Sequence, residues 1–125
     1  MTDKDIEQDI QAAGKTAPRV TPADIEENIV SEHYFTAADG LKGFLRERDY
    51  SEVEQIMLEH GGSPLHLLTF CVLVLRNGFT VTGESACASP ENFSAIIGKA
   101  VARANAVQKI WPLMGYELKQ RLSQK

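Results

Sequence analysis

The sequence has few of the residues from which metal centres and nucleic-acid surfaces are built. Only two cysteines, Cys71 and Cys87, and three dispersed histidines occur among its 125 residues. Neither HExxH nor CxxC is present, so the sequence predicts no metal site and no cofactor. Thirteen basic and seventeen acidic residues give a net charge of −4, which does not provide the basic surface of a protein that binds duplex nucleic acid.

Long apolar runs are also absent. The longest, around residues 67–75, is too short to span a bilayer. Because no signal peptide pattern opens the chain, we expect a cytoplasmic protein with reduced thiols and no membrane partner. Residues 1–18 are polar and contain Gly14 and Pro18, which predicts a disordered tail ahead of a single α+β domain at residues 19–125.

Two helices are predicted in the first half of the domain. Thr21 and Pro22 are typical of a helix cap and first helical position, and residues 34–40 are interpreted as the exit of this N-terminal helix. The capping box at residues 51–54 predicts a short middle helix that ends at Gly61-Gly62. Its inward residues are expected to be Val53, Ile56, Met57 and His60.

The strongest local signal is an antiparallel β-hairpin in residues 67–87, where Asn77-Gly78 joins two β-rich runs. Asn-Gly favours a type I′ turn, in which both central residues have positive φ. Counting outward from this turn pairs Arg76 with Phe79, Val74 with Val81, Val72 with Gly83 and Cys71 with Glu84.

This register predicts which face of the hairpin meets the core. The predicted core face carries Phe70, Val72, Val74, Phe79 and Val81, and the half-polar opposite face carries Thr69, Cys71, Leu73, Leu75, Thr80, Thr82 and Glu84. Gly83 is interpreted as a strand bulge. Because a two-stranded ribbon is only marginally stable, both faces need helices or a partner chain.

A long C-terminal helix is predicted after the hairpin, with Ser89 as its cap and Pro90 in its first turn. Its apolar seam is Phe93, Ile97, Ala100, Ala104, Val107 and Trp111. Pro112 should end this helix, and residues 115–122 should form a short final helix. Because the hairpin and the seam have more surface to bury than the short helices cover, we expect a homo-oligomer built from dimers.

Several segments resemble one family. The runs at residues 77–87 and 89–93, and the helix end at residues 109–116, are similar to the small tailed-phage proteins grouped as the gene 49 / gene 66 family. Residues 21–26 and 31–39 are similar to it too. The resemblance covers most of residues 20–122 and is weakest at about residues 40–63. It implies a phage or prophage accessory protein expressed inside a bacterium, but no reaction and no catalytic residues.

The sequence does not contain a recognisable catalytic set. Cys71, mid-strand and paired with Glu84 in the predicted register, has no cation to lower the pKa of its thiol and is interpreted as buried and inert. Cys87 lies near a predicted helix start and would be more reactive, but a small packed residue is the favoured interpretation. Glu84 and Ser85 have no identifiable third group to orient them for acid–base chemistry.

A binding site is better supported than a catalytic one. The predicted helix start at Ser89 could receive an anion, with Asn92, Lys99 and Arg103 along one flank. The candidate ligand-binding residues are Arg76, Phe79, Thr82, Glu84, Ser85, Ser89, Asn92, Lys99 and Arg103. The structural alternative is that Ser89 and Asn92 only cap the helix, that Glu84 pairs with Lys99 or Arg103, and that Arg76 and Phe79 form a cation–π pair.

Three classes of function are compatible with these features. The first is a non-enzymatic counter-defence protein that sequesters a small nucleotide-derived signal in the cytoplasm of the infected host. The second is an inhibitor or adaptor that binds a host protein through the helix seam or the hairpin edge. A small enzyme is the least favoured. We expect the first class because the resemblance implies a phage accessory gene, for which counter-defence is a role by analogy, and because catalytic residues are lacking while polar groups surround a predicted helix start.

Overall fold

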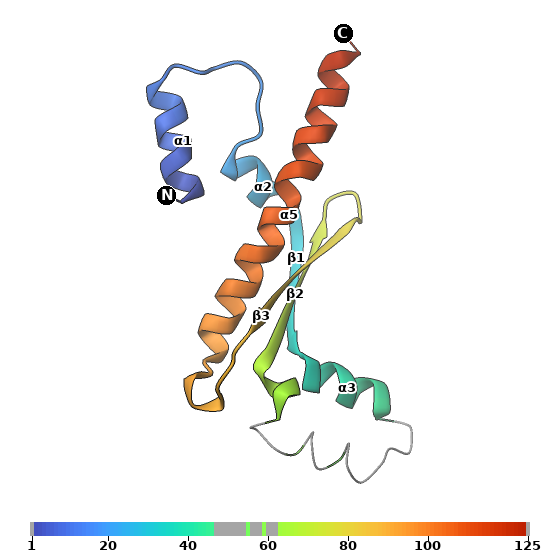
Figure 1. Cartoon of the computed structure of the whole chain (residues 1–125). Coiled ribbons are helices and arrows are strands. Elements are labelled where there is room, and N and C mark those ends of the chain that lie inside the picture. Colours follow the sequence, from blue (N-terminus) through green and yellow to red (C-terminus); the bar gives the residue numbers. More distant parts are fainter. Residues whose placement is uncertain (1, 47–54, 56–58, 60–62, 125) are drawn as a thin grey trace.

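The computed structural model describes residues 2–46, 55, 59 and 63–124 (Figure 1). In chain order its elements are α1 (Asp3–Ala12), α2 (Pro22–Asn28), β1 (Ile29–Thr36), α3 (Ala37–Leu45), the 3₁₀ turn η1 (Pro64–Leu67), β2 (Leu68–Leu75), β3 (Thr80–Ala86), the 3₁₀ turn η2 (Pro90–Asn92) and α5 (Ala95–Ser123). The strands form an antiparallel sheet in the order β1-β2-β3, and α5 packs along β3 and β2. The predicted α+β class is confirmed.

The hairpin is present, but its turn and register differ from the prediction by one residue. Leu73 pairs with Val81, and the loop has three residues, because Leu75 N donates to Phe79 O at 2.8 Å. Gly78 has a φ of +90°, whereas no described residue other than glycine has positive φ. The predicted type I′ turn is therefore wrong, and the loop is a three-residue one that ends on a left-handed glycine.

The one-residue shift reverses the predicted faces of β2, whereas Val81 of β3 lies on the core face as predicted. The core face carries Cys71, Leu73, Leu75 and Val81, whereas Phe70, Val72 and Val74 are only half-buried on the outer face. Gly83 provides the reason. A Cβ there would collide with the Ala102 carbonyl oxygen and lie 2.9 Å from the Cα of Ala106, so α5 can approach only on this face. Gly83 is a helix-packing position, and its predicted role as a bulge is wrong.

Residues 29–36, interpreted from the sequence as part of a helix and its exit, form the third strand. Tyr34 pairs with Cys71 and Phe35 with Phe70, and the rings of Phe35 and Phe70 lie 5.7 Å apart. The preceding helix α2 begins as predicted, with Thr21 and Asp24 forming a capping box. The sequence did not predict this strand because it contains the polar residues Ser31, Glu32 and His33. These residues are tolerated because the outer face of the strand remains partly in contact with solvent.

The first residues of the chain also differ from the predicted disordered tail. Thr2 and Asp5 form a capping box that begins α1, and Asp3 and Glu7 bond to Trp111 and Arg19 of the domain. No side chain of α1 is buried. Composition alone could not predict this helix, since caps and polar contacts hold it in place rather than apolar burial.

Helix α5 begins later and continues further than predicted. Ser94, not Ser89, caps it by accepting a hydrogen bond from Ile97 N, and the helix runs through Pro112 to Ser123 without a separate final helix. Its buried stripe is Gly98, Ala102, Ala106 and Ile110. The predicted seam is therefore wrong in its N-terminal half, where Ile97 is 64% exposed. The helix packs against Gly83 through Ala102 and Ala106 instead.

Other predictions concern parts of the chain that the structure does not describe. The middle helix predicted from residue 51, with Val53, Ile56, Met57 and His60 inward, lies outside the described residues. Within the described ranges, no helix combines the length and hydrophobicity needed to cross a bilayer. Among these same residues, no group of three or more His, Cys, Asp or Glu side chains could hold a metal ion.

Candidate functional site

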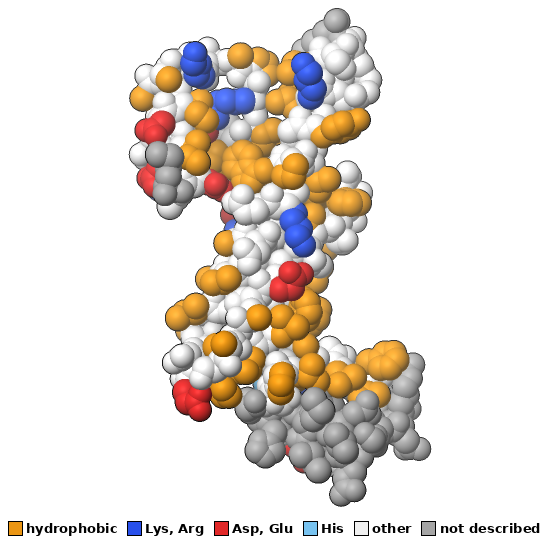
Figure 2. Space-filling view, in the orientation of Figure 1, with side chains coloured by type: hydrophobic (Ala, Val, Ile, Leu, Met, Phe, Trp, Pro, Cys, Tyr) orange, Lys and Arg blue, Asp and Glu red, His pale blue; other side chains and the backbone are white. Residues whose placement is uncertain are grey.

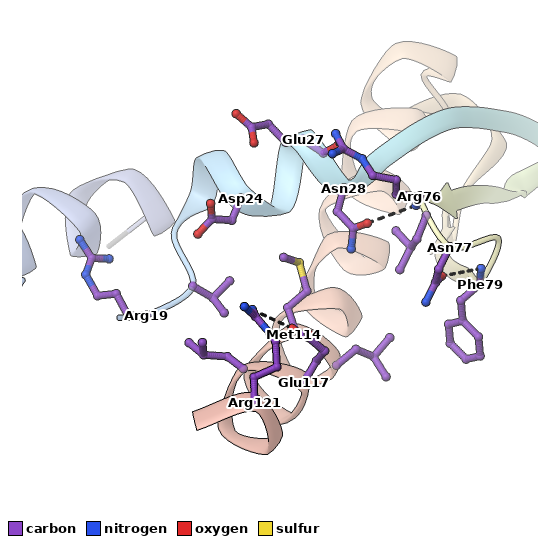
Figure 3. A pocket seen from close by; sticks show the side chains of 14 residues that line it. Arg19, Asp24, Glu27, Asn28, Arg76, Asn77, Phe79, Met114, Glu117 and Arg121 are labelled. Atoms are coloured by element: carbon purple, nitrogen blue, oxygen red, sulfur yellow. Dashed lines mark hydrogen bonds and ion pairs between the residues drawn. The ribbon is translucent and has the colours of Figure 1, made fainter. Parts of the chain in front are cut away.

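A cleft of about 950 Å³ lies between α2, the hairpin loop and the C-terminal half of α5 (Figure 3). This volume lies in the range of ligand sites of about 300–1,000 Å³. Apolar side chains on its walls are Val20, Leu75, Phe79, Leu113, Met114 and Leu118, and polar ones are Arg19, Asp24, Glu27, Asn28, Arg76, Asn77, Glu117 and Arg121.

Backbone bonds hold the hairpin loop against the end of α2. Arg76 N donates to Asn28 O at 2.9 Å and to Asn28 Oδ1 at 3.1 Å, and Arg76 Nη2 donates to Glu27 O at 2.6 Å. Within the loop, Phe79 N donates to Asn77 Oδ1 at 2.9 Å. These bonds fix the cleft wall that the loop provides, and Figure 3 shows Arg76 extended toward the end of α2.

The three arginines of the cleft differ in their partners. Arg19 forms a bidentate pair with Glu7 at 2.5 and 2.6 Å, and Arg121 pairs with Glu117 one turn earlier on α5 at 2.6 Å. The guanidinium of Arg76 bonds a backbone carbonyl instead and has no salt bridge to any described carboxylate. Arg76 is therefore the arginine of this cleft whose charge no described carboxylate neutralises.

Charge pairing also sets the protonation of Glu7. The hydrogen-bonded Arg19 guanidinium lowers the pKa of Glu7 to about 2. Glu7 is thus ionised near neutral pH and keeps Arg19 paired.

The cleft also contains an aromatic surface. The ring of Phe79, which lines the cleft together with Arg76, is 55% exposed. A guanidinium and an exposed ring in one cleft can bind a phosphate and stack a base.

Of the predicted site residues, only Arg76 and Phe79 lie in this cleft. Thr82 and Glu84 on β3 contact α5, through Lys109 Nζ at 3.5 Å and Asn105 Nδ2 at 2.8 Å to the Glu84 carbonyl. Ser85 is half-buried on the same strand and pairs with Thr69. These groups help to fix the helix on the sheet.

The segment between β3 and α5, which contains Ser89 and Asn92, lies at the other end of the sheet from the hairpin loop (Figure 1). Ser89 Oγ donates to Glu91 at 2.5 Å and caps no helix, and Asn92 belongs to the three-residue turn η2. The predicted anion site at a helix start is wrong, because α5 begins five residues after Pro90, at Ala95.

Arg103 and Lys99 lie outside the cleft, where they reach from α5 to residues of β1. Arg103 bonds Glu32 at 3.0 Å and Glu26 at 2.9 Å, and Lys99 Nζ lies 5.9 Å from the centre of the Tyr34 ring. These acidic partners raise the pKa of Arg103. The structural alternative that Glu84 pairs with Lys99 or Arg103 is wrong for Arg103, since the unpredicted strand β1 brings Glu32 to the helix.

The two cysteines have different surroundings. Cys71 is fully buried, and burial raises the pKa of its thiol, as expected for an inert group. Its strand partner is Gly83 rather than Glu84. Cys87 is half-buried, and its thiol donates to Ser89 O at 3.1 Å.

Sequence reasoning missed the cleft residues from outside the hairpin. Asn28 and Glu27 end α2, and they meet the hairpin loop only because the next residues form β1 beside β2. Arg121 and Met114 reach the cleft because α5 continues past Pro112. The available signal was the hairpin loop itself, which placed Arg76 and Phe79 side by side.

Comparison with known proteins identifies the family. The chain belongs to the phage protein (N4 Gp49/phage Sf6 gene 66) family, which matches residues 20–122. This match confirms the resemblance seen in the sequence and leaves α1 outside the matched region. No curated protein and no solved structure matches the chain.

Proposed function

We propose that this phage protein is a non-enzymatic accessory protein of counter-defence, which sequesters a small nucleotide-derived signalling molecule in the cytoplasm of the infected bacterium. The observation that carries the proposal is the cleft of about 950 Å³ lined by Arg76, whose charge no described carboxylate neutralises, and by the exposed ring of Phe79. Membership of a phage protein family supports the accessory role.

The chemistry of the cleft suits a phosphate-bearing ligand with a planar base. Arg76 would bind the phosphate through charge-assisted hydrogen bonds, and the base would stack on Phe79. The side-chain amide of Asn28, whose oxygen already accepts from Arg76 N, would offer N–H donors to a base edge. The lining residues include no serine, cysteine, histidine or lysine, so we propose binding rather than covalent catalysis.

Native mass spectrometry of the protein purified from infected cells tests this proposal. A retained molecule with the mass and ultraviolet absorbance of a nucleotide derivative supports sequestration. A co-purifying host protein without such a molecule would favour the inhibitor or adaptor function instead. Turnover of a retained nucleotide during incubation would contradict the non-enzymatic role.

We also propose that the protein forms a homo-oligomer built from dimers through the N-terminal half of α5. Ile96, Ile97 and Val101 are 83%, 64% and 42% exposed there, and hydrophobic side chains follow this part of the helix in Figure 2. Exposed apolar stripes of this kind are typical of association surfaces. The small residues Ala100 and Ala104, also exposed, would let a second helix approach closely.

A further inference from the structure

Helix α1 is attached to the domain mainly through polar contacts. Asp3 Oδ2 accepts a hydrogen bond from Trp111 Nε1 at 3.2 Å, and Glu7 pairs with Arg19. No residue of α1 is buried, and a cavity of about 220 Å³ separates part of the helix from Trp111. Such an interface can open without exposing a packed core.

Arg19 connects this interface to the ligand cleft. Its side chain lines the cleft, yet both of its terminal nitrogens bond the carboxylate of Glu7. The pair is largely shielded from water, with the side chains of Arg19 and Glu7 only 26% and 15% exposed. In Figure 3 the guanidinium of Arg19 lies beside the ribbon of α1, away from Arg76.

A carboxylate and a phosphate present the same acceptor geometry to a guanidinium, so they compete for one arginine. We propose that α1 is an autoinhibitory latch, in which Glu7 occupies the Arg19 guanidinium that a phosphate of the cleft ligand would otherwise bind. Release of α1 makes the Arg19 guanidinium available to the ligand, in addition to Arg76 on the other side of the cleft. This inference rests on the proposed function, because it regulates the same site.

Trp111 provides a direct readout of the latch. It is the only tryptophan of the chain, and its indole nitrogen bonds Asp3 of α1. Release of α1 removes this bond and admits water to the ring, so the emission of Trp111 should shift to longer wavelength. The shift reports the position of α1 independently of any ligand affinity.

Isothermal titration calorimetry tests the latch by measuring the affinity of the full chain for ADP, which has a diphosphate and a purine. Glu7→Gln should bind ADP about tenfold more tightly than the wild type, the equivalent of one added charge-assisted contact. The double variant Glu7→Gln/Arg19→Gln should lose this gain. Asp9→Asn removes the same charge from an exposed position on α1 and should change the affinity less than twofold.

The outcomes separate the latch from the cleft. Equal ADP affinity of the wild type and Glu7→Gln overturns the latch and leaves the cleft standing if Arg76→Ala still abolishes binding. A gain that persists in the double variant also overturns the latch, since Arg19 would not be the competing group. If neither the wild type nor Glu7→Gln binds ADP, while circular dichroism shows both folded, the latch and the cleft fail together for this ligand class.

Discussion

Gly83 on β3 lies directly against Ala106 on α5, so close that a Cβ on the glycine would be 2.9 Å from the Cα of the alanine. This contact decides which face of the hairpin is buried. It also sets the height of α5 above the sheet and thereby the position of the helix end that closes the cleft.

Gly83→Ala should destabilise the protein by about 3 kcal/mol, because the added methyl group forces the helix off the strand. Gly115→Ala is the matched control, since a Cβ there meets nothing within 4 Å and should stabilise the helix by about 0.5–1 kcal/mol. Urea denaturation measures both. Equal stability of Gly83→Ala and the wild type would show that helix and sheet are not in direct backbone contact.

Arg103→Ala should cost about 1–2 kcal/mol of unfolding free energy, because the arginine joins Glu26 of α2 and Glu32 of β1 to α5. Lys99→Ala, four residues earlier, should change stability by less than about 0.5 kcal/mol, as exposed substitutions usually do. Thermal or urea unfolding compares the two. The prediction fails if both substitutions have the same effect.

The Glu7–Arg19 pair should make the attachment of α1 depend on pH. The hydrogen-bonded Arg19 guanidinium lowers the pKa of Glu7 from its ordinary value of 4.5 to about 2 in the folded protein. A depressed carboxyl pKa stabilises the paired state above the unfolded value, and this contribution is lost as pH falls through the folded value. Trp111 emission should therefore shift as the pH falls from about 4.5 toward 2, and less so in Glu7→Gln. An identical titration of both proteins would contradict a role for this carboxylate.

Light scattering tests the proposed oligomer. The wild type should have a mass greater than one chain at micromolar concentration, and Ile97→Glu should shift it toward the monomer, because a charge in an apolar interface is costly. Gln120→Glu adds the same charge at an exposed position further along α5 and should leave the mass unchanged. A monomeric wild type removes this proposal.

The sequence was sufficient for the elements with strong local signals and insufficient for their contacts. Thr21-Pro22 and Asn77-Gly78 correctly marked a helix start and a hairpin, since capping and turn chemistry act over a few residues. The register depended on whether Asn77 joined Gly78 at positive φ, and the shift of one residue exchanged the inward and outward residues of β2. The strand β1 has mixed polarity and became recognisable only through its pairing with β2.

The candidate site, too, was predicted from the sequence only where its residues are close neighbours in the chain. Arg76 and Phe79 were found because they are neighbours in one loop. Lys99 and Arg103 were assigned to the site from helical spacing alone, but spacing could not show that Glu32, on an unpredicted strand, already neutralises Arg103. Long-range ion pairs of this kind depend on tertiary placement.

The most direct test of the account compares two cations, one in the cleft and one on the predicted helix flank. The wild type, Arg76→Ala and Lys99→Ala should be purified from infected cells and their bound small molecules quantified by native mass spectrometry. We predict that the wild type and Lys99→Ala retain a nucleotide derivative and that Arg76→Ala, folded by circular dichroism, loses it. Retention by Arg76→Ala together with loss by Lys99→Ala would contradict the cleft as the binding site.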